Sequence, residues 1–479
     1  MLFSSTVFLL FFFPIVFIVY YLLTFSRPLQ NGCLFLASVF FYAWGEPIYV
    51  LLMLGSIFVN WLAGLLIGHY DVYQKKRKFV LILAGILNIG VLFLFKYTGF
   101  VVRNAYSMMG RMQPTINIAL PIGISFFTFQ ALSYVIDVYR RDVKVEKNPL
   151  YIGLYISFFP QLIAGPIVRY NSIAEQMRTR KSSLDKISVG SCRFVAGLAK
   201  KVLLANSFAL LADQIFSWSE MGIENYNVPV VMAWLGMIAY TLQIYFDFSG
   251  YSDMAIGLGL IFGFKFEENF NYPYVSTSLV DFWRRWHISL TSWFREYVYF
   301  PLGGSRVENK DKMIRNLFIV WLLTGLWHGA EWTFLLWGLW HFIFQLAERF
   351  FGYAKNNSHR ILMWFYTMAV VSFGWVAFRA KDLYQTGIYF LNLFGLSGNS
   401  FWNTMTGFLL RDYAVFFALG FLFSTPIARR CNALLAKKQM GLVGKCMSVL
   451  YPVAMMSLFL ICMSYLVRGG YNPFIYFNF

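Results

Sequence analysis

Long charge-poor apolar runs dominate the sequence, and they restrict what this chain can fold into. A transmembrane helix needs about 20 mostly apolar residues, because the hydrocarbon core of a bilayer is about 30 Å thick. Runs that fit this need lie near residues 6–24, 31–45, 48–68, 79–95, 118–136, 150–168, 228–246, 316–330, 332–347, 361–378, 413–428 and 447–467. Further apolar pieces lie near 187–216, 249–264 and 383–410. We predict about 11 spanning helices, with the short runs forming half-helices or re-entrant segments whose backbone is covered by protein or by a water-filled cavity.

The composition excludes the other broad classes of protein. Hydrophobic residues make up 59% of the 479 residues and charged residues only 13%, whereas a soluble protein carries roughly 25% charged residues. Disordered chains are poor in apolar residues, so disorder is excluded as well. The net charge of +18 fits the basic cytosolic loops of a membrane protein better than a nucleic-acid partner, for which no recognisable module is present. The sequence therefore predicts an all-α polytopic membrane protein, with one integral-membrane domain over residues 1–479.

Basic clusters predict how the chain is oriented in the membrane. Residues 75–78 and 429–445 are rich in Lys and Arg, and the positive-inside rule places such segments in the cytosol. Counting spans from these clusters places both termini outside. The first apolar segment lacks the basic start of a cleaved signal peptide, so we expect it to be retained. The tail 471–479 is unusually apolar for an external end, and we expect it to pack into the protein or to contact a partner.

His328 is the first candidate for chemistry, because an ionisable residue inside a membrane segment is by default a functional hypothesis. Thr324 and Glu331 lie four residues before it and three after it, so either could share its helical face and fix its tautomer. An apolar setting favours the neutral imidazole, which is the form that a general base needs. A buried histidine satisfied by a carbonyl is the alternative. Small neighbours leave space for a helix or for a substrate: Gly325, Gly329 and Ala330.

His287 is the second candidate and lies in the amphipathic segment 279–296, which is too polar to span. Read as one interfacial or re-entrant helix, the segment places Trp283, His287 and Phe294 near one face. Asp281 is spaced to pair with Arg284 or Arg285. Three basic side chains could hold the phosphates of an acyl carrier: Arg284, Arg285 and Arg295. The alternative is an amphipathic helix whose arginines only face lipid headgroups.

Three further polar residues are expected to support the site. Asp247 and Asp253 lie in an apolar stretch rich in small residues, and we expect both to pair with arginines in a structural role. His341 follows an aromatic stretch and is expected to pack near the site. No metal site is expected, because the histidines lack a convergent acidic set and the five cysteines form no CxxC pair. The sequence also lacks a Walker loop, a GxSxG elbow and an HExxH motif.

Several strings of the chain resemble the membrane-bound O-acyltransferases, and in particular their alginate O-acetylation branch. These strings are LQIYFDFSGYSDMAIGLG at 242–259, FWRRWHISL at 282–290, YVYFPLGG at 297–304 and LTGLWHGA at 323–330. The opening MLFSS and the closing NPFIYFNF are also similar to that branch. The resemblance spans nearly the whole chain and is densest over about 240–345, where we expect the catalytic core.

The resemblance implies a ring of transmembrane helices around a thinned centre, with a tunnel joining the cytosolic and outer faces. It implies that His328 matches the family's near-invariant histidine and His287 its second, branch-specific one. It also implies acyl transfer from a cytosolic thioester, such as acetyl-CoA, without a permanently bound cofactor. Similar proteins acetylate alginate, cellulose or peptidoglycan, or D-alanylate teichoic acids, and they work with extracytoplasmic SGNH-type transferases.

Together these inferences predict an O-acetyltransferase of the bacterial inner membrane. It would move acetyl groups to hydroxyls of an alginate-like extracytoplasmic polysaccharide or to a partner transferase. His328 would act as general base or acyl relay, and His287 would orient the donor thioester or stabilise developing charge. The alternatives are a passive acyl channel, D-alanyl or peptidoglycan-type acyl transfer, and a small-molecule transporter.

Overall fold

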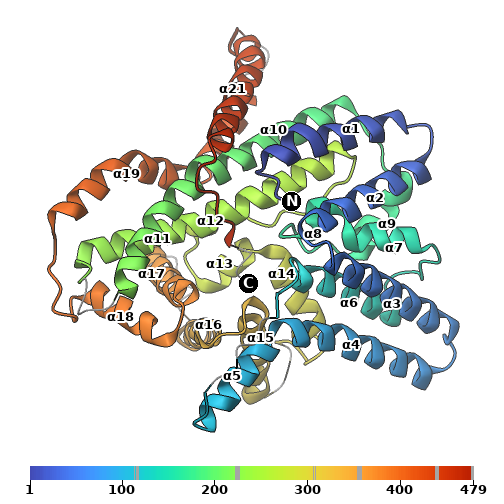
Figure 1. Ribbon diagram of the computed structural model, residues 1–479, viewed down its shortest axis with the longest axis horizontal. Coiled ribbons are helices and arrows are strands. Elements are labelled where there is room, and N and C mark those ends of the chain that lie inside the picture. Colours follow the sequence, from blue (N-terminus) through green and yellow to red (C-terminus); the bar gives the residue numbers. More distant parts are fainter. Residues whose placement is uncertain are drawn as a thin grey trace. The chain divides into compact units, whose positions relative to one another are not determined.

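The computed structural model describes the whole chain except residues 113, 115–117, 222–226, 306, 308, 353–358, 437–441 and 476–479, and it describes side chains outside 432–447. The described residues form helices and connecting loops, and no β-strand occurs among them (Figure 1). Within this part, seven helical stretches are long and apolar enough to cross a membrane: Tyr49–His69, Gln74–Lys96, Leu184–Glu220, Val230–Ile261, Arg360–Arg379, Thr404–Phe423 and Ser448–Val467. The prediction of an all-α polytopic membrane protein is therefore confirmed.

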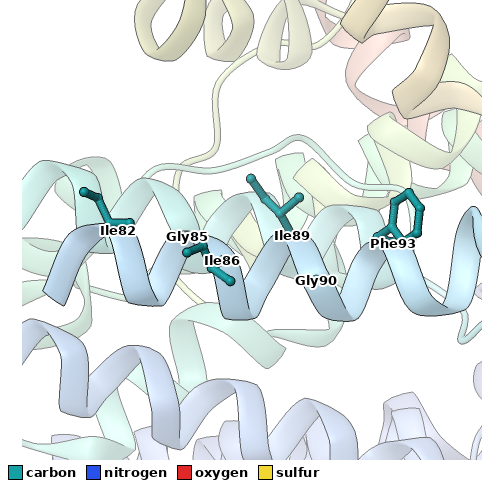
Figure 2. A pocket seen from close by; sticks show the side chains of 6 residues that line it. All are labelled: Ile82, Gly85, Ile86, Ile89, Gly90 and Phe93. Atoms are coloured by element: carbon teal, nitrogen blue, oxygen red, sulfur yellow. The ribbon is translucent and has the colours of Figure 1, made fainter. Parts of the chain in front are cut away.

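The helices group into two compact units, and the first consists of Met1–Phe194 and Tyr251–Glu268. Its main elements are η1 (Phe8–Phe12), α1 (Phe13–Leu22), α2 (Arg27–Gly45), α3 (Tyr49–His69), α4 (Gln74–Lys96), α5 (Thr98–Met108), α6 (Ile124–Arg140), α7 (Pro149–Ser157), α8 (Phe159–Leu162), α9 (Tyr170–Thr179) and the larger part of α10 (Leu184–Ala199). Helices α3, α4 and α6 pack against one another. An apolar groove of about 530 Å³ follows the outer side of α4, where Figure 2 shows Ile82, Gly85, Ile86, Ile89, Gly90 and Phe93. The apolar lining is what a lipid-facing helix surface requires.

One predicted span of this unit is wrong. The run 150–168 does not form a single helix, because α7 ends before Phe158, whose ψ of 111° is not helical. The short helix α8 then begins, with Pro160 in its first turn. A proline inside a continuous helix would remove one backbone hydrogen bond and clash with the preceding turn. The proline is tolerated here because the chain starts a new helix at this point.

The second unit consists of Val195–Gly250 and Asn269–Phe479. Its elements are η2 (Lys200–Ala205), α11 (Asn206–Glu220), most of α12 (Val230–Ile261), η3 (Pro273–Val275), α13 (Leu279–Arg285), α14 (Ile288–Phe294), η4 (Arg295–Tyr299), α15 (Lys310–His328), α16 (Trp332–Phe351), α17 (Arg360–Arg379), α18 (Leu383–Phe394), α19 (Thr404–Phe423), α20 (Ile427–Ala436) and α21 (Leu442–Val467). Helix α12 is continuous, whereas the sequence predicted two separate apolar runs near 228–246 and 249–264. Helix α16 packs against both α15 and α17 (Figure 1).

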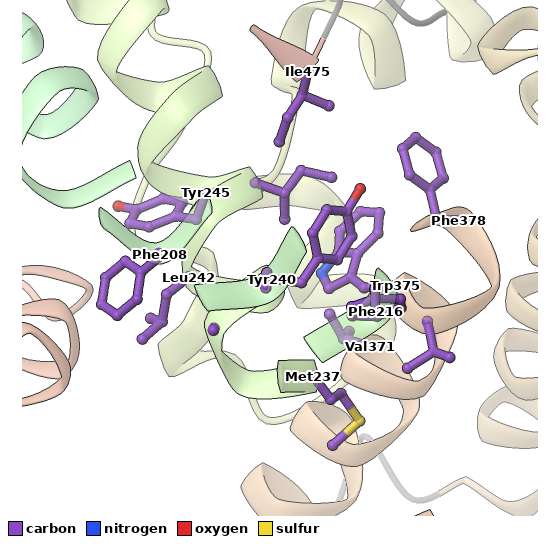
Figure 3. Close-up of a cluster of buried hydrophobic side chains, with 14 of the residues drawn as sticks. Phe208, Phe216, Met237, Tyr240, Leu242, Tyr245, Val371, Trp375, Phe378 and Ile475 are labelled. Carbon is purple, nitrogen blue, oxygen red and sulfur yellow. The ribbon is translucent and has the colours of Figure 1, made fainter. Parts of the chain in front are cut away.

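Aromatic and large aliphatic side chains fill the core of the second unit. Figure 3 shows members of this cluster from α11, α12, α17 and the C-terminal segment: Phe208, Phe216, Met237, Tyr240, Leu242, Tyr245, Val371, Trp375, Phe378 and Ile475. Trp337 and Trp375 stack with ring centroids 5.9 Å apart. Fully burying such a side chain stabilises the fold by roughly 1.5–3 kcal/mol. This cluster forms the rigid surroundings in which the candidate site lies.

Candidate active site

His328 is the last residue of α15 and is 5% exposed. Three aromatic rings enclose it: the ring centroids of Trp327, Trp337 and Phe378 lie 4.9, 5.0 and 5.1 Å from that of the imidazole. The three neighbours come from α15, α16 and α17. The imidazole is thus held in an apolar enclosure, as the sequence predicted, and its position is set by three packed helices.

The space left by the glycines near His328 is taken by a neighbouring helix. A Cβ atom on Gly325 would lie 2.6 Å from the backbone oxygen of Phe334, and one on Gly329 would lie 2.1 Å from the Phe334 ring. Phe334 belongs to α16. Of the two interpretations that the sequence left open, close helix packing is the one that the structure supports.

The two predicted neighbours of His328 along its helix behave differently from each other. The hydroxyl of Thr324 donates to the backbone oxygen of Val320 at 2.7 Å, so its proton is used within α15. The sequence left open that Glu331 could share the helical face of His328, and the structure excludes this. Helix α15 ends at His328, and Glu331 is the extended residue that precedes α16.

His287 does not lie within a helix, contrary to the prediction for segment 279–296. Helix α13 ends at Arg285 and α14 begins at Ile288. Between them His287 has φ 43° and ψ 54°, which is the left-handed region. For a residue other than glycine, this backbone conformation costs of order 1–3 kcal/mol of folding free energy, and it persists only where the surrounding structure enforces it. The predicted common face of Trp283, His287 and Phe294 therefore does not exist.

Asn269 holds the ring of His287, and the sequence analysis missed it. Its Oδ1 lies 3.2 Å from Nδ1 of His287 and accepts from the backbone N–H of Ser289 at 3.2 Å. A backbone N–H can only donate, so the amide orientation of Asn269 is fixed with its oxygen toward both groups. His287 must then carry its proton on Nδ1, and Nε2 keeps the lone pair. Asn269 lies 18 residues before His287, a separation from which no sequence pattern predicts a contact.

Both histidines contact the ring of one tryptophan. The ring centroid of Trp327 lies 5.9 Å from that of His287 and 4.9 Å from that of His328. His287 is 1% exposed and also contacts the edge of Phe248 at 4.6 Å. Among the described residues, Nε2 of His287 is buried and has no hydrogen-bond partner. A proton acceptor with a free lone pair thus lies one ring away from His328.

His341 packs beside these residues, as predicted. Its ring stacks on Trp321 at 5.1 Å and meets the edges of Trp283 at 5.0 Å and Trp337 at 5.1 Å. Trp337 also contacts His328. Within the described part of the chain, no group of three or more His, Cys, Asp or Glu side chains is arranged to hold a metal ion.

The three predicted donor-binding arginines have different surroundings. Arg285 forms an ion pair with Asp281 at 3.0 Å, so one of the two predicted pairings of Asp281 is confirmed. Arg285 also lines a pocket. Arg284 is exposed at the end of α13. Arg295 is exposed in η4, 3.5 Å from the hydroxyl of Ser292 and 3.8 Å from Glu296.

The two predicted structural carboxylates form ion pairs, each with a different kind of partner. Asp253, in the first unit, pairs with Arg193 at 2.9 Å as predicted. Asp247, in the second unit, pairs with Lys201 at 2.7 Å, so the prediction of an arginine partner is wrong for this residue. Lys201 follows Lys200 in an otherwise apolar stretch, a position that the sequence analysis treated as part of an apolar piece and did not single out.

The C-terminal segment packs onto the same ion pair. The backbone N–H of Ile475 donates to Oδ2 of Asp247 at 2.9 Å, and the Lys201 ammonium donates to the backbone oxygen of Pro473. Earlier in the segment, the hydroxyl of Tyr471 donates to Asp213 at 2.5 Å. The expectation that the tail packs into the protein is confirmed for residues 471–475, and residues 476–479 lie outside the described residues.

The fold and the site together define a class of protein. It is a membrane protein of many helices with two buried histidines in an aromatic core. The sequence profile of the membrane-bound O-acyltransferase (MBOAT) family matches residues 145–384. The chain is 43% identical to a probable alginate O-acetylase AlgI of Pseudomonas syringae pv. tomato, over 81% of this chain and 74% of the relative. It is 37% identical to a peptidoglycan O-acetyltransferase of Helicobacter pylori, over 84% and 81% of the two chains. A teichoic acid D-alanyltransferase of Bacillus subtilis is 30% identical over 67% and 83%.

The chain therefore belongs to the membrane-bound O-acyltransferase family. It is an O-acyltransferase embedded in a membrane by several helices. The resemblance that the four sequence strings indicated is confirmed.

Proposed function

We propose that this protein transfers acetyl groups across the bacterial inner membrane. The donor is a cytosolic thioester such as acetyl-CoA, and the acceptor is a hydroxyl of an alginate-like polysaccharide or of an SGNH-type partner transferase. The higher identity to the alginate O-acetylase (43%) than to the D-alanyltransferase (30%) supports acetyl over D-alanyl transfer. A charged donor cannot cross about 30 Å of hydrocarbon. A tunnel within a ring of about 11 spans would let the acyl group alone pass.

This proposal rests on one observation: the rings of His287 and His328 both contact the ring of Trp327. His328 takes the proton of the acceptor hydroxyl while its oxygen attacks the thioester carbonyl. The new C–O bond forms, the C–S bond breaks, and His328 returns the proton to the leaving thiolate. The surrounding aromatic side chains keep water away, which limits hydrolysis of the thioester. Arg284, Arg285 and Arg295 are proposed to contact the donor's phosphates.

His287 is proposed to bind the acceptor and not the donor, through a hydroxyl other than the reacting one, whose single proton goes to His328. Asn269 keeps Nδ1 protonated, so Nε2 can only accept a hydrogen bond. Burial lowers the pKa of His287 to about 3, so the ring remains neutral while it positions the acceptor. This differs from the role predicted from the sequence, in which His287 orients the thioester or stabilises developing charge.

The test is acetyl transfer from acetyl-CoA to alginate oligosaccharides, normalised to monodisperse protein. General-base catalysis contributes typically about 10²–10⁴-fold, so His328→Ala should lose at least a hundredfold in turnover. The pair His328→Ala, His287→Ala should be hardly worse than His328→Ala, because residues that act as a unit are non-additive. His69→Ala, which alters an exposed histidine at the end of α3, is the matched control.

The same assay separates the proposal from its alternatives. A passive channel or a transporter would consume no thioester in detergent. A folded His328→Ala protein that kept more than about a tenth of wild-type activity would contradict the general-base role. Peptidoglycan fragments offered in place of alginate oligosaccharides test the acceptor. Preferred transfer to those fragments would overturn the alginate-like assignment while leaving the acetyl-transfer chemistry in place.

A further inference from the structure

Three arginines from distant parts of the chain line one pocket in the second unit. The pocket has a volume of about 370 Å³ and is lined by Asn271, Tyr272, Arg285, Pro426, Arg429 and Arg430. Arg285 is the last residue of α13, and Arg429 and Arg430 lie in the first turn of α20. The sequence placed Arg429 and Arg430 in a cytosolic basic cluster and did not connect them with the segment that carries His287.

The charges in this pocket are poorly balanced. Nε of Arg285 lies 3.0 Å from both carboxylate oxygens of Asp281, and Nη1 donates to the backbone oxygen of Asn271 at 3.3 Å. Arg429 and Arg430 have no ion pair and no side-chain hydrogen bond within the part of the chain that the structure describes. The first turn of α20 has no acidic residue, and the N-terminus of a helix carries a partial positive charge. Two cations at this end are therefore unfavourable unless an anion binds.

We propose that this pocket binds a phosphate group carried on a larger molecule. The planar fork of arginine binds phosphate through paired hydrogen bonds, and the first N–H groups of a helix add further donors. The volume lies within the usual range of about 300–1,000 Å³ for ligand pockets, which is more than one inorganic phosphate fills. Two molecules present this chemistry at a membrane surface: the coenzyme A part of the acyl donor and the headgroup of an anionic phospholipid. The donor alternative rests on the transfer reaction proposed above.

The pocket is joined to His287 through one short loop. The backbone N–H of Asn271 donates to the oxygen of Arg285 at 2.9 Å, and that of Ile288 donates to the oxygen of Asn269 at 3.0 Å. Asn269 in turn holds the His287 ring. A ligand that immobilises Arg285 therefore also stiffens the loop that sets the position of His287. Binding in the pocket is expected to be visible as slower hydrogen exchange over residues 269–288.

The experiment measures that exchange in protein reconstituted into vesicles, with two arms. In the first arm the vesicles are pure phosphatidylcholine and coenzyme A is titrated. In the second arm the vesicles contain phosphatidylglycerol and coenzyme A is absent. The test variant is the pair Arg429→Gln, Arg430→Gln. Arg360→Gln is the matched control, because Arg360 is an exposed arginine at the start of another helix, α17, and lines no described pocket.

If the donor's phosphates fill the pocket, coenzyme A slows exchange in the wild type and in Arg360→Gln. The double glutamine variant then needs about tenfold to a hundredfold more coenzyme A, because charge-assisted hydrogen bonds are lost. If a lipid fills the pocket, phosphatidylglycerol gives this pattern and coenzyme A does not. Either result supports the phosphate site. An unchanged exchange rate in both arms, or a double variant that responds like the wild type, would overturn it.

Two further variants keep the test decisive. Arg429→Lys with Arg430→Lys retains the charge but loses the planar fork, so it should weaken binding less than the glutamine pair, and it carries the test if that pair fails to fold. His328→Ala should respond to the ligand like the wild type, because binding in the pocket does not require transfer. A wild-type protein that shows the exchange response but transfers no acetyl group would count against the proposed chemistry and leave the pocket standing.

Discussion

Neutralising one member of the Lys201–Asp247 pair should release the C-terminal segment from the protein. Both side chains are at most 3% exposed, and their charged atoms lie 2.7 Å apart. The same two groups bind the segment through the Ile475 N–H and the Pro473 oxygen. Because the segment packs onto the buried ion pair, its opening would expose these charges to water.

The magnitude follows from the burial of the pair. Asp247→Asn keeps the shape of the side chain and an acceptor for the Ile475 N–H, but it leaves the Lys201 ammonium without a counter-charge. Removing one partner of a buried ion pair costs about 3–5 kcal/mol. Opening of the segment hydrates the ammonium and relieves this cost. At about 1.4 kcal/mol per tenfold change, opening becomes easier by up to about a hundredfold to several thousandfold.

Hydrogen exchange of residues 471–475, followed by mass spectrometry, measures this opening directly. Asp247→Asn and Lys201→Met should each exchange up to about a hundredfold to several thousandfold faster. The double variant should return toward the wild type, because it leaves no buried charge. Asp412→Asn, on the exposed surface of α19, is the matched control. An Asp247→Asn protein within tenfold of the wild type, or a double variant as fast as that single variant, would refute the reasoning.

Two further predictions follow from the site. Gly325→Ala should lower the stability of the folded protein by roughly 1–3 kcal/mol, because the new Cβ would lie 2.6 Å from the Phe334 oxygen. Gly85→Ala, on the open surface of α4, should be neutral. Equal thermal stabilities of the two purified proteins would contradict this prediction. His287 has a pKa lowered from 6.5 to about 3 by burial, so the unfolded chain binds a proton below pH 6.5 that the folded chain does not. The free energy of unfolding should therefore fall as the pH drops from about 6.5, by at most about 1.4 kcal/mol per unit, and His287→Gln should remove this part of the slope in denaturant titrations; an identical slope in both proteins would contradict the assignment.

The spanning helices were the most predictable part of the fold. The run predicted at 48–68 is α3 at Tyr49–His69, because an uninterrupted apolar run of this length has few other structures available to it in a membrane. The errors fall where polar or special residues interrupt the pattern. Pro160 divided the run at 150–168. In the opposite sense, Asp247 did not divide α12, because Lys201 neutralises its charge.

The site was predictable in its residues but not in its geometry. His328 and His287 stood out because each is an ionisable group in apolar sequence, and the structure brings both to Trp327. The partners that orient and anchor the site come from distant segments. Asn269 and Lys201 are ordinary polar residues in the sequence, and only tertiary packing places them beside His287 and Asp247.

The break at His287 shows why local periodicity failed there and what the break accomplishes. A continuous helix over 279–294 would satisfy its own backbone and would keep His287 on the face of Trp283. Instead, the loop at Asn269–Asn271 supplies two backbone hydrogen bonds to Arg285 and Ile288, which offset part of the cost of leaving the helix. The left-handed residue then turns its imidazole toward Trp327 and leaves Arg285 at a helix end, where it lines the arginine pocket. One loop thereby fixes both the tautomer of His287 and the position of Arg285. A ligand bound to Arg285 would therefore restrict the motion of the His287 imidazole through two backbone hydrogen bonds.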